Sequence, residues 1–185
     1  MAEAFINQVN RAVGIVTSSS NASIGVGLTW MSGISTAHVA IHDIVDNANF
    51  IAGTKVTQVG VSSVQLDRAS TNTVAATASN VSFLGPTTSY SSASATKSIL
   101  IGGTFANLTQ NDINIYVEVV DQSAATGPIG VSSVQLASDI PIPNGSSFVI
   151  SEAGKTILEA FDQITVYCDT ADAVDVNLAI LSGVS

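Results

Sequence analysis

A seven-residue sequence that occurs twice sets the strongest constraint on how this chain can fold. Gly60-Val-Ser-Ser-Val-Gln-Leu66 returns unchanged at residues 130–136. The segments before the two copies are also alike, since residues 23–30 and 98–105 both end in Gly-x-Thr-aromatic. Residues 39–46 and 113–121 both end in Val-Asp. This self-similarity indicates an internal duplication, and its long period predicts two related domains rather than a solenoid of short repeats.

The spacing and alternation of apolar residues predict an all-β chain. Apolar and polar residues alternate over residues 113–119 and again over residues 174–180, the period of a strand with one buried face. Short strands separated by small polar turns favour β-sandwiches. We therefore expect two related β-sandwich domains, Ig-like or jelly-roll-like. Residues 39–45 are predicted to be a strand as well, because their duplicate is one.

Domain limits follow from composition along the chain. A run of Ser, Thr and Ala at residues 87–96 is the best linker candidate, which places the boundary near residue 90. The expected parts are an N-terminal arm at residues 1–12, a first sandwich at 13–90 and a second at 91–185. A chain of 185 residues is long enough for two small domains.

Charge is sparse, and this excludes several classes of partner. Charged residues make up 10% of the chain, far below the usual quarter, and the net charge is −9 with five basic residues. Binding to nucleic acid or to an anionic membrane requires clustered Lys and Arg, so neither is expected. A weakly charged polar surface suits proteins that bury surface in an assembly; a plain Ser/Thr-rich β-protein is the alternative.

The chain shows no targeting segment and no disulfide. Its start lacks the basic and apolar regions of a signal peptide, and no apolar run is long enough to span a membrane. Cys168 is the only cysteine, in an apolar stretch, and is expected to be a buried structural thiol. We expect synthesis in a cytoplasm, with a final location that can differ, such as a particle released by lysis.

No residue pattern supports catalysis, a cofactor or a metal. His38 and His42 would lie about 13 Å apart on a strand, too far for one ion. Asp169, Asp172 and Asp175 near a turn lack the fixed glycine-turn loop of a calcium site. There is no nucleophile elbow and no phosphate loop. The chain is therefore expected not to be an enzyme, and Trp30 and Phe105, at equivalent places in the two copies, are expected to pack in cores.

The N-terminal segment carries apolar residues that suit an interface. Phe5, Ile6 and Val9 precede the first expected strand and would be poorly placed on a free tail. We expect residues 1–12 to pack on another subunit in a homo-oligomer, with more than about 1,000 Å² buried per chain.

Three stretches resemble a group of small structural proteins of tailed bacteriophages, frequent in phages of marine bacteria and cyanobacteria. They are the opening Phe5–Gly14, the segment Ile101–Asn107, and Ile140–Ile150 with the short segments Lys155–Ala160, Asp162–Ile164 and Val174–Val176 that follow it. In that group the last part of the chain resembles the pattern Pro-x-Gly-x-Ser followed by Leu-x-x-Gly-Asp-x-Ile. A strand of alternating apolar and polar residues closes it. Phe161 stands where the group usually has Gly, so a different turn is expected there, because Gly often supplies a positive φ.

The resemblance implies a structural role in a phage particle. It suggests a head decoration (cement) protein that contacts other virion proteins, with a component of the neck or tail as the alternative. A carbohydrate-binding β-sandwich is a further alternative, which the aromatic content of 5% and the single Trp argue against. The expected location is the virion, after synthesis in the host cytoplasm.

Overall fold

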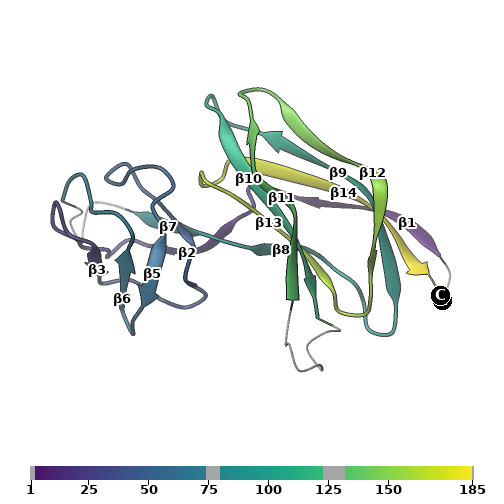
Figure 1. The fold of residues 1–185 in the computed structure, drawn as a ribbon, viewed down its shortest axis with the longest axis horizontal. Helices are drawn as coiled ribbons and strands as arrows, with labels where there is room; N and C mark the ends of the chain where they lie inside the picture. The colour runs from purple at the N-terminus through teal and green to yellow at the C-terminus, as the bar shows by residue number, and fades with distance from the viewer. Residues whose placement is uncertain (1–2, 74–79, 123–131, 185) are drawn as a thin grey trace. The chain divides into compact units, whose positions relative to one another are not determined.

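The computed structural model describes residues 3–73, 80–122 and 132–184, and every regular element in them is a β-strand (Figure 1). The chain is therefore all-β, as the sequence predicts. The strands are β1 Ala4–Asn10, β2 Ile15–Ser19, β3 Trp30–Ser32, β4 Ile44–Asp46, β5 Val56–Val59, β6 Ser63–Leu66, β7 Val81–Leu84, β8 Thr87–Ser91, β9 Lys97–Asn107, β10 Ile113–Asp121, β11 Ser132–Ile142, β12 Ser147–Leu158, β13 Gln163–Cys168 and β14 Val174–Val184.

The chain divides into two compact units that do not follow the expected domain limits. One unit, here called the sandwich, consists of Met1–Val13, Pro86–Cys168 and Asp172–Ser185. The other, the inserted unit, consists of Gly14–Gly85 and Asp169–Ala171. The first strand of the sandwich is thus separated from the rest of it by the whole inserted unit. The boundary near residue 85 lies close to the expected one, but the chain enters the sandwich before the inserted unit as well as after it.

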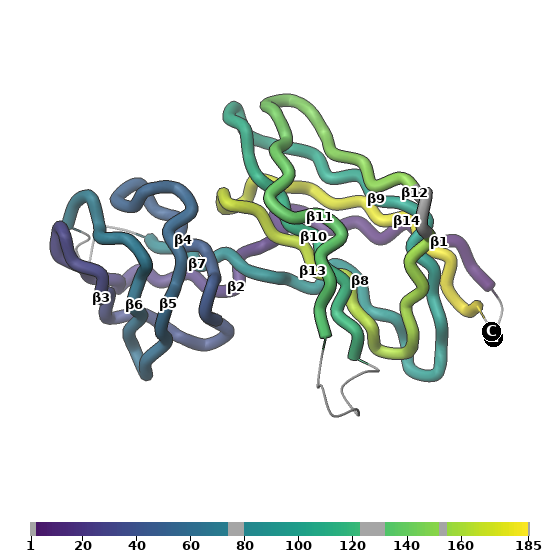
Figure 2. The backbone as a smooth tube through the Cα atoms, viewed as in Figure 1, coloured from purple at the N-terminus to yellow at the C-terminus, as the bar shows by residue number. Residues whose placement is uncertain are grey.

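The sandwich is built from two four-stranded antiparallel sheets. Their strand orders are β1-β14-β9-β12 and β11-β10-β13-β8. Counted in chain order within the sandwich, the eight strands run 1-8-3-6 in one sheet and 5-4-7-2 in the other. This is the strand order of a jelly roll, a double-sheet architecture of two Greek keys. The trace in Figure 2 shows the first and last strands, in purple and yellow, side by side in one sheet.

One hydrophobic core joins the two sheets of the sandwich. Phe105, Leu158 and Leu178 enter it from the first sheet, and Ile115 and Ile164 enter it from the second. Because alternate side chains of a strand point to opposite faces, the residues between these positions face outward. Burying several large aliphatic side chains, each worth about 1.5–3 kcal/mol, is the main stabilisation available to such a sandwich.

The inserted unit has short strands around a separate core. Its sheets are β2-β7-β4 and β3-β6-β5, and both supply side chains to one cluster that includes Met31, Val64, Leu66 and Phe83. Loop residues fill much of the same cluster, which suits strands of only three to five residues.

The predicted duplication of domains is not confirmed. Trp30 pairs with Gln65 of the first heptapeptide, whereas Phe105 pairs with Phe148 and Val176 in the sheet that does not contain β11. Residues 98–105 lie in one continuous strand, while their counterparts at 23–30 form turns and isolated bridges before β3 begins. The two similar sequences therefore take different pairings.

Three local predictions also need correction. Residues 39–43 form turns instead of a strand, and strand β4 begins only at Ile44. The expected linker at residues 87–96 begins with strand β8, which pairs with β13. The expected arm at residues 1–12 contains β1, which pairs with β14 of its own chain from Ala4 to Asn10. Composition missed both strands because neither has a regular apolar period.

The turn at Phe161 keeps a backbone that suits glycine. Phe161 has a φ of 70°, in the left-handed region that L side chains rarely adopt. The turn is held by a hydrogen bond from the Phe161 amide to the Ser92 carbonyl, 3.1 Å long. Phe161 therefore takes the positive φ that a glycine would supply, with the strain that this implies for a bulky residue.

Candidate interaction surface

The outer face of sheet β1-β14-β9-β12 carries ordered rows of side chains across four strands. Its side chains form rows, because directly paired residues on antiparallel strands point to the same side. One row runs Phe5, Leu181, Ile99, Ile157 across all four strands. A second runs Asn7, Ala179, Gly102, Ser151, and a third runs Val9, Asn177, Thr104, Val149.

The first row is apolar from one edge of the sheet to the other. Phe5 and Ile157, at its ends, are 79% and 60% exposed, and Ile99 and Leu181 between them are half-buried. Four aligned apolar side chains of this size leave a continuous hydrophobic ridge in solvent, and contiguous apolar patches of this kind mark interaction sites.

The second and third rows form hollows beside that ridge. A hollow of about 340 Å³ lies over Gly102, Thr104, Ala179 and Val149. A neighbouring hollow of about 300 Å³ lies between Val9 and Asn177 and also touches Thr104. Small residues create this relief: at Gly102 an added Cβ would lie 2.9 Å from the Ile150 carbonyl oxygen, so the position has no room for a side chain without movement of the neighbouring strand.

Charge is nearly absent from these rows. Asp175, one position beyond the third row, is the charged residue nearest to them on β14, and its carboxylate already accepts a hydrogen bond from the Ala12 amide and lies 3.6 Å from the Arg11 guanidinium. The polar groups within the rows are the amides of Asn7 and Asn177 and the hydroxyls of Thr104 and Ser151. A partner that covers these three rows buries no charged side chain from within them, and burying an unpaired charge is the costly part of forming an interface.

The three residues predicted for an interface divide between the two faces of β1. Phe5 and Val9 are paired with Leu181 and Asn177 and point outward, where Val9 is 68% exposed. Ile6 is paired with the buried Ile180, so it points toward the core side at the open edge of the sheet. The prediction for subunit contact therefore stays open for Phe5 and Val9, while the position of Ile6 suits a role in the edge of the core.

The sequence analysis missed most of this surface. Ile99, Leu181, Val149 and Ile157 lie on the other three strands of the sheet, and none of them was predicted to lie at an interface. A signal was present: Ile99-Leu100-Ile101 and Ile180-Leu181 are apolar at consecutive positions, and consecutive apolar residues on a strand must put one of them on the outer face.

The residues considered for metal binding are not brought together. His38 and His42 occupy exposed turns with φ of 67° and 80°. Asp169 accepts a hydrogen bond from the Thr170 hydroxyl. The Asp175 carboxylate accepts one from the Ala12 amide and lies 3.6 Å from the Arg11 guanidinium. Among the described residues no group of three or more His, Cys, Asp or Glu side chains has the arrangement of a metal site.

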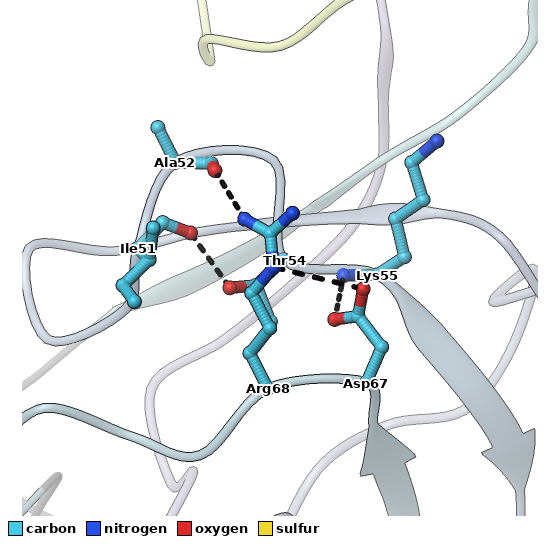
Figure 3. A network of polar contacts seen from close by, with 6 residues as sticks. All are labelled: Ile51, Ala52, Thr54, Lys55, Asp67 and Arg68. Atoms are coloured by element: carbon cyan, nitrogen blue, oxygen red, sulfur yellow. Dashed lines mark hydrogen bonds and ion pairs between the residues drawn. The ribbon is translucent and has the colours of Figure 1, made fainter.

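A polar network in the inserted unit has a structural role (Figure 3). The Asp67 carboxylate accepts a 2.8 Å hydrogen bond from the Lys55 amide, and the Arg68 guanidinium donates to the Ala52 carbonyl at 3.0 Å. Thr54 donates its hydroxyl to the Ile51 carbonyl at 2.6 Å. These contacts link residues 51–55 to the end of β6. In each of them a side chain forms a hydrogen bond with a backbone amide or carbonyl group outside the strands.

The two aromatic residues expected in cores have different environments. Phe105 is fully buried and stacks on Phe148 with ring centroids 6.0 Å apart. Trp30 is 49% exposed on β3, so the core prediction is wrong for it. Cys168 is buried in the sandwich core, as predicted. Asn144 lies in a turn with Gly145, which has a φ of 67°.

No protein-family model, curated protein or solved structure matches this chain. In the part of the chain that the structure describes, no helix has the length and apolar character needed to cross a membrane.

Proposed function

We propose that this chain is a structural protein of a phage particle, and that it docks onto other virion proteins through the outer face of sheet β1-β14-β9-β12. The observation that carries the proposal is that face: an apolar ridge and two hollows on one sheet, with three rows of side chains that hold no charged residue and with Arg11 and Asp175 at the margin of one hollow. The role that fits best is a head decoration protein, which stabilises a capsid by contacts between proteins.

The architecture supports this role by analogy. Jelly rolls occur in viral capsid proteins and also in lectins, so the fold alone leaves both classes open. The composition adds to the case for a particle subunit, because a chain with 10% charged residues can bury much surface against neighbours at little desolvation cost. The resemblance of the opening and of residues 140–176 to phage structural proteins points to the same class.

A neck or tail component is the second candidate, and the same face would serve it. A carbohydrate-binding role has less support, because sugar sites want aromatic platforms. The exposed large aromatic residues Phe5, Trp30 and Phe161 lie on β1, on β3 and at a turn before β13, and only Phe5 belongs to the outer face.

The proposal is tested with virions of the phage that encodes this chain. The protein should be present in purified particles, and electron microscopy with a tagged subunit should place it on the head. Its absence from particles would contradict the proposal, and a position at the neck or tail would select the second candidate. Binding of the purified protein to separated heads and tails gives the same distinction in solution.

The docking face is tested with a matched pair of valine substitutions. Val149→Lys places a charge in the third row of the face and should reduce binding to the particle at least about tenfold, because the charge would be buried unpaired. Val61→Lys, at a position of the inserted unit that is almost fully exposed, should bind as the unaltered protein does. Equal binding of both variants would contradict docking through this face.

A further inference from the structure

The four edge strands of the sandwich are not equally protected against pairing with another chain. Edge strands are usually blunted by charges, proline, bulges or short length. Strand β11 contains Pro141 and Asp139 and has two register shifts against β10. Strand β12 contains Lys155 and a register shift against β9, and β8 is five residues long with a shift against β13.

Strand β1 has none of these devices. It is seven residues long, it pairs with β14 without a register shift, and its sequence Ala-Phe-Ile-Asn-Gln-Val-Asn contains no charge, proline or glycine. Its outward side chains Phe5 and Val9 are largely exposed. A regular, uncharged and partly apolar edge is a template for adding another strand.

The sequence of this edge is complementary to itself. In an antiparallel pair centred on Asn7, Phe5 of one copy lies opposite Val9 of the other, and Glu3 lies opposite Arg11. Phe5, Asn7 and Val9 share the outer face of β1, and Glu3 and Arg11 flank the strand at its two ends. The two flanking charges are opposite in sign, and the two-fold axis of such a pair makes each favourable contact twice.

We infer that two copies of this chain pair through strand β1, antiparallel and centred on Asn7, so that the sheet β1-β14-β9-β12 continues from one copy into the other. The net charge of −9 makes most surfaces of two copies repel each other. The segment from Glu3 to Arg11 sums to zero charge and offers two Glu–Arg contacts across the pair. The charges that flank β1 therefore favour a second copy of this chain as the partner that binds to this edge.

This pairing has a consequence for the outer face. The first row of each copy would continue into the third row of the other, since Phe5 lies opposite Val9 across the two-fold axis. The inference does not depend on the proposed role in a virion, because it rests on the sequence and exposure of one edge strand.

Sedimentation of purified protein tests the dimer, and charge reversal tests its register. The unaltered chain should dimerise with a dissociation constant below about 100 µM. Glu3→Arg alone and Arg11→Glu alone each place like charges opposite at both ends and should weaken the dimer about tenfold. An equimolar mixture of the two variants restores opposite charges at both ends and should form a mixed dimer as tight as the unaltered one.

The outcomes separate clearly. A mixture no tighter than either variant alone would overturn the centred register. A chain that stays monomeric at several hundred µM would overturn self-pairing, and the edge would then take a strand from a different protein. Circular dichroism of each variant checks that loss of the Arg11–Asp175 contact, 3.6 Å in the structure, leaves the fold intact.

A cross-linking experiment tests the same geometry without altering charge. Cys168 is buried, so an introduced surface thiol is the reactive one. Asn7→Cys places two thiols opposite each other on the two-fold axis, within the reach of a disulfide, whereas Val9→Cys places each thiol opposite Phe5. We expect Asn7→Cys to form dimers at least about tenfold faster than Val9→Cys under mild oxidation. Equal rates would contradict the pairing. An equimolar mixture of Phe5→Cys with Val9→Cys should cross-link at about half the rate of Asn7→Cys, because about half of its dimers are mixed and place the two thiols opposite each other.

Discussion

The two copies of one tetrapeptide, Ser63–Leu66 and Ser133–Leu136, have opposite environments. In the inserted unit Val64 and Leu66 are 0% and 2% exposed, whereas in the sandwich Val134 and Leu136 are 61% and 36% exposed. The first copy lies in β6, the central strand of a three-stranded sheet. The second lies in β11, an edge strand with two register shifts, whose buried side chains come from Ala137 and Ile142.

The comparison shows that an apolar residue on a strand becomes core only if another layer covers it. Local propensity is identical in the two copies, so it cannot explain the difference. What differs is the neighbourhood: β6 has strands on both sides and a second sheet over its apolar face, while β11 has one neighbouring strand in its sheet.

The strongest test of this comparison replaces the same residue in both copies. Leu66→Ala should lower the free energy of unfolding of the inserted unit by about 3 kcal/mol, because it removes fully buried methyl groups and leaves a cavity. Leu136→Ala should cost less than about 1 kcal/mol, since that side chain is partly in water. Urea unfolding followed separately for the two units measures both values. Equal costs would contradict the difference in environment.

A second comparison concerns one buried carboxylate in each unit. In the sandwich, both oxygens of Asp162 accept backbone amides, from Gln122 at 2.9 Å and from Glu159 at 2.8 Å. Asp162→Asn replaces one acceptor by a donor and should cost about 2 kcal/mol. In the inserted unit, Asp43 accepts a bond from the Ala40 amide at 2.8 Å through one oxygen, a bond that an asparagine oxygen can keep.

The pH dependence of Asp43 has a defined sign. Burial raises the pKa of the Asp43 carboxyl above its ordinary value, and the hydrogen bond from Ala40 opposes this only in part. The folded state therefore holds the proton more tightly than the unfolded state, so this contribution to stability is complete below the unfolded pKa and is lost as the pH rises through the folded pKa. Asp43→Asn should raise the stability of the inserted unit at pH 7 and flatten its dependence on pH above 4. A loss of stability at pH 7 would contradict this account.

The smallest expected effects concern turn backbones, where neighbouring layers have little influence. Phe161 has a φ of 70°, a backbone conformation that is strained for a residue with a side chain and unstrained for glycine. Phe161→Gly should therefore stabilise the sandwich by about 1 kcal/mol. Gly53 of the inserted unit has a φ of 75°, and a Cβ there would meet open space, so Gly53→Ala should cost about 1 kcal/mol through backbone strain alone. Thermal unfolding of the two variants measures both shifts, and shifts of the same sign would contradict the argument.

The sequence predicted those parts of the fold whose information is local. The alternation over residues 113–119 predicted β10, and that over 174–180 predicted most of β14. A repeat of two residues shows which side chains can share a buried face of a strand. The sequence prediction failed over residues 39–43. A strand was predicted there because the similar segment at residues 113–121 is one, but these residues form turns. For the surface, it predicted contact positions at Phe5 and Val9 but not at Ile99 and Ile157, because the sequence does not show which strands lie side by side.

By itself, then, the sequence determined the all-β class, several strands and the burial of Cys168. These features depend on local sterics, side-chain periodicity and average hydrophobicity. Only the tertiary structure decided that β1 joins β14 across the inserted unit, and that one copy of a repeated sequence is core while the other is surface. The reason is physical: hydrogen bonds in a sheet link residues far apart along the chain, and the burial of a strand depends on which layer covers it.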